Sequence, residues 1–279
     1  MVLRVDDLPR VSGLLCTLPR SGSWLLAEYL HNSECAGTPE EYFRPDYYEW
    51  YLSRWCAAPG RSITEYLRLC WMRTVTANGV FSAKLHWYQM DWLLGRLRGS
   101  RGAGMAPHEL IGSAFPHVRY IHLVREDTAL QALSWYRAIR TDAWFHLPGV
   151  DREPEDERPD LQQVRWLEDV LVDHGERWRD YFRAAGVSPL EVSFTDLVER
   201  PDLAVRRVLA HLDAGYPSDR PLPPGRLSRQ SDEWTDFWRR AYLQVREALP
   251  HRDASVRWSP QQNRFIRAGL DVSDHDAPE

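Results

Sequence analysis

Strand-like and helix-like patterns alternate along most of the chain, and this alternation constrains the fold more than any other feature. Residues 11–17, 80–87 and 118–124 are predicted to be buried strands from their apolar or alternating patterns, and a fourth strand is expected at 189–194. Helical patterns separate these strands. Such alternation is typical of an α/β fold with a central, mostly parallel sheet flanked by helices. In these folds ligands bind at the carboxyl ends of the strands.

The segments between the strands supply predicted helices and two predicted loops. Residues 95–116 contain five glycines and two prolines, so this segment is expected to be a loop or an insertion. Residues 146–160 are polar, charged and rich in proline, which is typical of a mobile surface loop. No segment resembles a linker between two cores, so residues 1–279 are expected to form a single domain. Helices are predicted over 24–33, 89–99, 125–140, 161–185 and 202–212, and over most of 227–250.

Charge and motif content exclude several classes of protein. The 279-residue chain has a net charge of −5, which disfavours a nucleic-acid binder that relies on bulk positive charge. No window approaches the roughly 18 apolar residues of a transmembrane helix, and the first residues lack the apolar run of a signal peptide, so a cytoplasmic location is expected. The four cysteines show no CxxC spacing and the histidines no HExxH pattern, so no protein metal site is expected.

The turn after the first predicted strand has the layout of a phosphate-binding loop. Its sequence over residues 19–24 is PRSGSW, and a predicted helix follows directly. Gly22 allows a tight turn and a close approach to a ligand, and the helix N-terminus offers free N–H groups. An ordinary strand-to-helix turn with a serine cap has the same spacing. The Walker pattern GxxxxGK[ST] is absent because Ser23 stands where its lysine would be, which argues against a common P-loop ATPase or kinase.

Lysine is almost absent from this chain. Of the 35 basic residues, 34 are arginine and one is lysine, Lys84. An excess of arginine is expected of a genome whose base composition favours arginine codons. That bias leaves two explanations for Lys84. It is either a chance survivor or a residue whose compact, rotatable ammonium is needed where a planar guanidinium does not fit.

Five segments resemble, in the same order, a family of bacterial sulfotransferases related to trehalose 2-sulfotransferase. The first is LPRSGSWLLAEYL followed by AGTPEEYFRPD, which is similar to the N-terminal signature of that family. VFSAKLHW is similar to its strand ending in Lys-Leu-aromatic, and YIHLVREDTALQALSWYRA to its Arg-x-Asp helix with a serine nine residues after the arginine. RWRDYFRAAGVSPLEVSFTDLVERPDLAVRRVLAHL and RQSDEWTDFW complete a match over roughly residues 11–242.

The resemblance implies a P-loop-like sulfotransferase fold and the transfer of a sulfuryl group from 3′-phosphoadenosine 5′-phosphosulfate (PAPS) to a hydroxyl of a small molecule, such as a sugar or a natural product. The group passes in line between two oxygens, so positioning and charge stabilisation carry the reaction and no metal is required. Family members are often dimers, and the sequence leaves the oligomeric state open. Carried over by position, the 5′-phosphosulfate would be bound by Arg20, Ser21, Gly22 and Ser23, the 3′-phosphate by Arg125 and Ser134, and the nucleotide would be covered by Arg229 and Gln230.

Several of these residues also have a purely structural alternative. Arg125 could form an ion pair at a helix start, Ser134 could bond back to a helix carbonyl, and Arg229 could lie at a solvated helix start. Trp24 departs from the family pattern, which usually has threonine there. Its backbone N–H remains available to the donor, but a hydroxyl is lost.

Two residues are candidates for the general base that accepts the proton of the acceptor hydroxyl. The family places its proposed base at the position of Glu41, with Glu40 expected as the more exposed neighbour; a surface acidic pair is the alternative. His86 is the second candidate. The family commonly has methionine there, but Lys84 and His86 reproduce the Lys-x-His spacing of the wider cytosolic sulfotransferases. Residues i and i+2 of a strand point to the same face, so Lys84 and His86 should project together. A packed or pocket histidine is the alternative.

The acceptor and two other function classes stay open at this point. The aromatic segment 42–51 either walls an acceptor pocket or packs a helix against the core. Trehalose is the substrate in the family's name, but His86 and this segment favour a different hydroxyl compound equally well. A small-molecule kinase is disfavoured by the absent Walker lysine. A non-catalytic nucleotide-binding module is disfavoured by Glu41 standing with the phosphate-binding residues.

Overall fold

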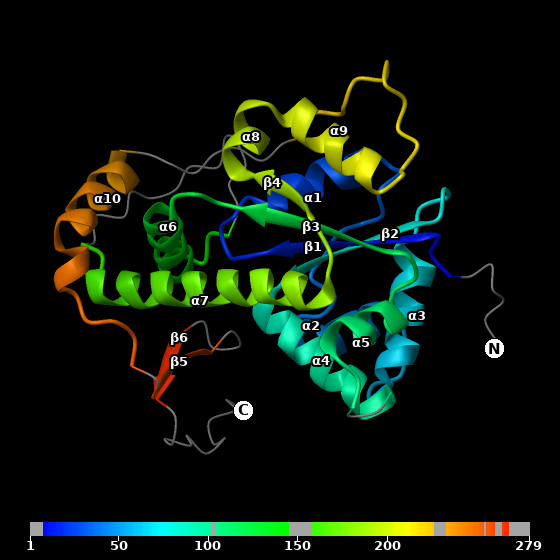
Figure 1. The fold of residues 1–279 in the computed structure, drawn as a ribbon, viewed down its shortest axis with the longest axis horizontal. Coiled ribbons are helices and arrows are strands. Elements are labelled where there is room, and N and C mark those ends of the chain that lie inside the picture. The colour runs from blue at the N-terminus through cyan, green and yellow to red at the C-terminus, as the bar shows by residue number, and fades with distance from the viewer. Residues whose placement is uncertain are drawn as a thin grey trace.

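A four-stranded parallel sheet forms the centre of the molecule (Figure 1). The computed structural model describes residues 8–101, 104–144, 158–225, 233–253, 255–259 and 264–267. The strand order is β2-β1-β3-β4, and every residue of β1 and β2 is buried. This arrangement confirms the predicted α/β class, because parallel strands covered on both faces are buried along their whole length. The strands are β1 (Val11–Thr17), β2 (Val80–His86), β3 (Val118–Val124) and β4 (Leu190–Ser193).

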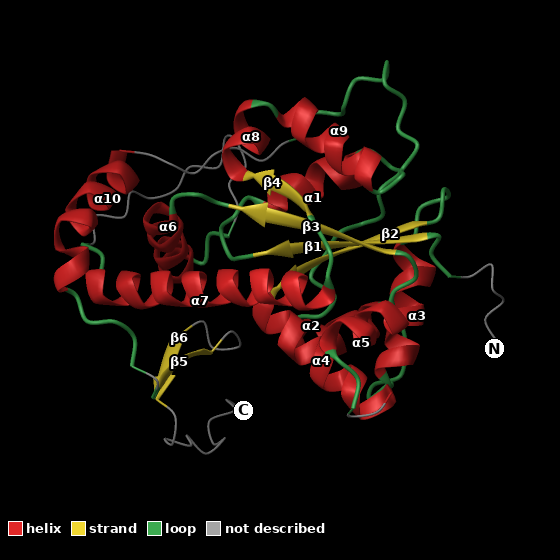
Figure 2. Ribbon diagram, in the orientation of Figure 1, coloured by secondary structure: helices red, strands yellow, loops and turns green. Residues whose placement is uncertain are grey.

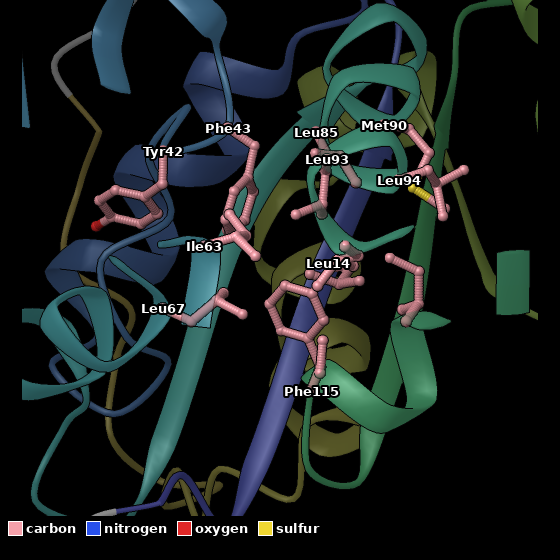
Figure 3. Packing of buried hydrophobic residues seen from close by; sticks show 14 of the residues in the cluster. Leu14, Tyr42, Phe43, Ile63, Leu67, Leu85, Met90, Leu93, Leu94 and Phe115 are labelled. Carbon is pink, nitrogen blue, oxygen red and sulfur yellow. The ribbon is translucent and has the colours of Figure 1, made fainter. Parts of the chain in front are cut away.

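Helices cover both faces of this sheet, as Figure 2 shows. On one face, α1, α8 and α9 pack through a core that includes Leu15 of β1 and Leu26 of α1. On the other, α2 to α5 and the C-terminal part of α7 enclose a larger core (Figure 3), in which Leu14 of β1 lies among aromatic side chains such as Phe43 and Phe115. The helices are α1 (Ser23–Asn32), α2 (Pro45–Arg54), α3 (Ile63–Thr74), α4 (Trp87–Arg101), α5 (Pro107–Ala114), α6 (Thr128–Thr141), α7 (Leu161–Ala185), α8 (Phe194–Glu199), α9 (Pro201–His211) and α10 (Glu233–Val245).

Most predicted elements are found within a few residues of their expected bounds. The helix predicted over 161–185 is α7, which Asp160 caps by accepting from two backbone N–H groups. Asp127 caps α6 through the backbone N–H of Leu130 at 2.8 Å. The predicted C-terminal helix is present as α10 and a short 3-10 turn, Arg246–Ala248. No helix within the described ranges is long and apolar enough to cross a membrane.

The loop predicted over 95–116 is wrong. α4 runs to residue 101 and α5 occupies Pro107–Ala114, although Gly102 and Ala103 lie outside the described residues. The glycines of α4 face away from the core, and an added Cβ at Gly95 or Gly99 would meet no atom within 4 Å. A glycine weakens a helix by about 1 kcal/mol, which burial of the opposite apolar face outweighs here.

Other parts were not predicted from the sequence. α3 begins at a capping box in which Ser62 and Glu65 bond reciprocally, and the Ser-x-x-Glu pattern of the sequence is the signature of such a helix start. The antiparallel pair β5 (Val256–Ser259) and β6 (Arg264–Arg267) was also missed. Most of the predicted loop 146–160, and the start of the segment 227–250, lie outside the described residues.

Candidate active site

The turn between β1 and α1 depends on backbone that few residues adopt. Arg20 and Gly22 have φ angles of 63° and 86°, and α1 begins at Ser23. A Cβ on Gly22 would lie 2.8 Å from the ring of Phe194 in α8, so both the positive φ and the close packing require glycine here. The turn therefore leads directly into α1, so the free backbone N–H groups of the helix N-terminus are available to an anion, as in known phosphate sites.

Ser21 provides a second feature of an anion site. Its side chain is fully buried, and its hydroxyl has no hydrogen-bond partner within the part of the chain that the structure describes. Buried polar groups are nearly always hydrogen-bonded, because leaving one unpaired costs about 1–3 kcal/mol. An unpaired hydroxyl in a turn beside a helix N-terminus is a donor available to an anion.

The residues expected to hold the donor's 3′-phosphate lie against the same turn. The guanidinium of Arg20 donates to the hydroxyl of Ser134 in α6 at 3.1 Å, and also to the carbonyl of Trp144. The guanidinium of Arg125 donates to the carbonyl of Arg20 at 2.9 Å and lies 4.5 Å from the ring centre of Phe194. The structure thus brings Arg20, Arg125 and Ser134 together. Arg229 and Gln230 lie outside the described residues.

A buried ion pair lies where β2 ends, beside this turn. The ammonium of Lys84 is 2.9 Å from Oε1 of Glu41, and the side chains are 0% and 8% exposed. Nε2 of His86 lies 3.7 Å from the same oxygen. The prediction that Lys84 and His86 project together is therefore confirmed, and Glu41 is the group that faces both of them.

Polar contacts fix the orientation of Glu41 and His86. The amide of Gln89, near the start of α4, donates to Oε2 of Glu41 at 2.7 Å, while its oxygen accepts the backbone N–H of His86 at 3.0 Å. The hydroxyl of Thr17, the last residue of β1, is 2.9 Å from Nδ1 of His86. Sequence reasoning missed both supporting residues. A glutamine three residues after a strand end is a helix-capping pattern and could have indicated Gln89.

Opposing influences set the charge state of the pair. Burial by itself would raise the pKa of Glu41, but Lys84 and then His86 lower it well below the usual range of a glutamate. Burial lowers the pKa of Lys84 below its ordinary value, and Glu41 acts against that shift. The 2.9 Å contact is that of a carboxylate with an ammonium. Glu41 is therefore held in the form that can accept a proton.

Trp24 contacts this ion pair and also lines a cavity of about 620 Å³. The Lys84 ammonium lies 3.3 Å from the centre of a Trp24 ring, a cation–π contact, and Trp24 itself forms part of the cavity wall. At a position expected to contact the donor, Trp24 thus covers the lysine and borders the cavity. The cavity is lined by Trp24, Thr38, Glu40, Tyr42, Asp46, Tyr47, Trp50, Tyr51, Arg54, Trp55 and Thr74.

Both alternatives for the aromatic segment 42–51 apply at once. Tyr48 is buried in the core on α2, whereas Tyr47 and Trp50 of the same helix line the cavity. Glu40 is the more exposed of the two glutamates, as expected, and it is half-buried in the cavity wall. Its carbonyl accepts the backbone N–H of Lys84 at 2.9 Å, which ties it to β2.

Comparisons with known proteins agree on one kind of enzyme. The family model of the Stf0 sulphotransferases matches residues 12–244. The trehalose 2-sulfotransferase of Mycobacterium tuberculosis is 28% identical over 266 residues, which cover 81% of this chain and 93% of that protein. The trehalose 2-sulfotransferase of Mycolicibacterium smegmatis is 28% identical over 268 residues, covering 85% and 97% of the two chains.

A solved structure shares the fold. The crystal structure of a sulfotransferase from Alicyclobacillus acidocaldarius matches with a TM-score of 0.51 and 14% identity, covering 88% of this chain and 94% of that one. At this identity the likeness concerns the arrangement of the sheet and its helices.

Proposed function

The chain belongs to the Stf0 sulfotransferase family and is a sulfotransferase, and from this premise we propose that its donor is PAPS and its acceptor a small molecule with a free hydroxyl group. The observation that carries the proposal is the convergence of Lys84 and His86 on one oxygen of Glu41, beside a turn suited to anions. A kinase is not favoured, because Ser23 stands where the Walker lysine would be.

The residues at the turn fit the two anionic ends of this donor. The unpaired hydroxyl of Ser21 and the N-terminus of α1 would hold the phosphosulfate. Arg125 and Ser134 would hold the 3′-phosphate, since a guanidinium offers a fork of donors to a phosphate. When bound, the donor supplies an activated sulfuryl group whose leaving group is a phosphate. Trp24 would offer only its backbone N–H to the donor, because it has no hydroxyl and its ring packs on the Lys84 ammonium.

The proposed reaction needs one proton acceptor and one mobile cation. The acceptor oxygen forms a bond to sulfur while the bond from sulfur to the 5′-phosphate oxygen breaks, which releases adenosine 3′,5′-bisphosphate. Glu41 takes the hydroxyl proton, and His86 shares or assists this role. Lys84 stabilises the negative charge on the sulfuryl and leaving oxygens. As Lys84 turns toward those oxygens, it releases Glu41, whose pKa then rises and makes it a stronger base.

The cavity beside Trp24 is the proposed acceptor site. Its aromatic wall supports stacking with a ring, either of a sugar or of a phenol-like compound. The cytoplasmic location expected from the sequence stays a prediction, and so does the homodimer that the family resemblance suggests.

Incubation with PAPS and a metabolite extract of the source organism tests the proposal. We expect mass spectrometry to detect a product that has gained one sulfuryl group, formed together with a stoichiometric amount of adenosine 3′,5′-bisphosphate. The Glu41→Gln variant, incubated in parallel, should form far less of this product. Formation of a phosphorylated product from ATP, with none from PAPS, would contradict the proposed donor.

A further inference from the structure

The proposed acceptor cavity combines aromatic rings with one unusual carboxylate. Six aromatic side chains line it, together with three charged residues. Aromatic faces attract cations as well as rings, so the charged groups of the wall decide which acceptor fits best. The charged lining residues are Glu40, Asp46 and Arg54.

Glu40 is the charged residue of the wall whose carboxylate has no direct partner. Its side chain makes no hydrogen bond or ion pair with any residue in the described ranges, although it is half-buried. Burial raises its pKa, and the charges of Lys84, His31 and Arg54 act in the opposite direction from beyond ion-pair distance. A half-buried carboxylate without a direct partner is open to a hydrogen bond from a bound cationic group.

The other two charged residues already have partners. Asp46 pairs with Arg44 at 2.8 Å. Arg54 is exposed, and its guanidinium lies over the ring of Trp50 at 5.1 Å. Neither therefore offers a second strong site for a charged ligand inside the cavity.

Backbone geometry gives Glu40 and Glu41 different directions. Glu40 forms a parallel bridge with Ala83 of β2, and successive residues of an extended, bridged segment point to opposite sides. Glu41 enters the buried cluster with Lys84, and Glu40 enters the cavity wall. Of the two adjacent carboxylates, Glu41 would face the reacting hydroxyl, and Glu40 would face another part of the same acceptor.

We infer that the acceptor carries a positively charged amine in addition to its hydroxyl, and that Glu40 binds this amine within the aromatic wall. This inference rests on the proposed function, because it assigns the cavity to the acceptor. It makes Glu40 a residue that determines acceptor specificity, and it favours amino sugars and aromatic amines over neutral analogues such as unsubstituted disaccharides.

Binding of matched probes to the protein saturated with adenosine 3′,5′-bisphosphate tests the inference. The pairs are tyramine with 4-ethylphenol and glucosamine with glucose, each followed by tryptophan fluorescence. In at least one pair we expect the cationic probe to bind about tenfold or more tightly than the neutral one, as a charge-assisted contact within an aromatic wall predicts. Glu40→Gln should reduce that ratio to near one without changing the affinity for the bisphosphate. Asp46→Asn, whose carboxylate is already paired, should keep the ratio.

The outcomes separate this inference from the function on which it rests. If the bisphosphate binds but neither cationic probe is preferred, or if none of the four probes binds, the inferred acceptor class is wrong while the donor assignment stands. A preference that survives Glu40→Gln also overturns the inference. Failure of the bisphosphate itself to bind would overturn both.

Discussion

Lys84→Arg is expected to lower kcat/KM for sulfuryl transfer at least about a hundredfold in a protein that remains folded. Lys84 is fully buried, with Glu41 at 2.9 Å on one side and the ring of Trp24 at 3.3 Å on another. An arginine keeps the charge but needs more space, and its planar group cannot rotate within this gap to follow a transferring oxygen. The loss should therefore come from position and not from charge.

Three measurements separate this effect from unfolding. Steady-state kinetics with PAPS gives the loss of activity, thermal denaturation reports the fold, and titration with adenosine 3′,5′-bisphosphate reports the donor site. Overpacking by the larger side chain should lower the free energy of unfolding by about 1–3 kcal/mol. Arg183→Lys is a matched control, because it exchanges the same two residue types at an exposed position of α7. This variant should leave activity unchanged. An active Lys84→Arg enzyme would make the single lysine an accident of composition.

Glu41→Gln is expected to reduce kcat about a thousandfold, within the range that general-base residues contribute. The amide cannot accept the acceptor's proton, although it occupies the same volume. His86→Ala is expected to cost less, about tenfold or below, because His86 contacts Glu41 and Thr17 and is the assisting group. The two variants are compared through kcat at a saturating donor concentration. A larger loss in His86→Ala would make His86 the base, and unchanged turnover would remove His86 from the mechanism.

Removing Glu41 also leaves Lys84 buried without its partner, which costs about 3–5 kcal/mol. Glu41→Asp keeps the charge and therefore should stay folded, yet it withdraws the carboxylate and should still lose most of its activity. A lowered pKa of Glu41 also means that the ion pair stabilises the fold at neutral pH, and that this contribution is lost as the pH falls through the lowered value. In the Glu41→Gln variant, the free energy of unfolding should therefore fall less on acidification than in the unmodified protein.

Local patterns were sufficient to predict the sheet and the direction of two site residues. The strands were found from their apolar or alternating patterns, and Lys84 and His86 project together because side chains of a strand repeat every two residues. The end of α4 and the whole of α5 were missed because the glycines that indicated a loop lie on the outer side of helices whose other face is buried.

Contacts between distant segments could not be predicted in this way. Gln89 reaches Glu41 across 48 positions of sequence, and Trp24 covers Lys84 because α1 follows β1 and β1 pairs with β2. The unpaired state of Glu40 likewise depends on how α2 closes the cavity. Such features are set by tertiary packing, which the periodicity of a single segment does not contain.

Calorimetric titration with adenosine 3′,5′-bisphosphate and with ATP tests the donor site most directly. The two ligands share the adenosine and the 5′-phosphate, but the first carries the 3′-phosphate that Arg125 and Ser134 are proposed to bind. We predict saturable binding of the bisphosphate and at least about tenfold weaker binding of ATP, since a phosphate held by a guanidinium fork contributes more than 1.4 kcal/mol. Binding of ATP alone would contradict the assignment of PAPS as donor.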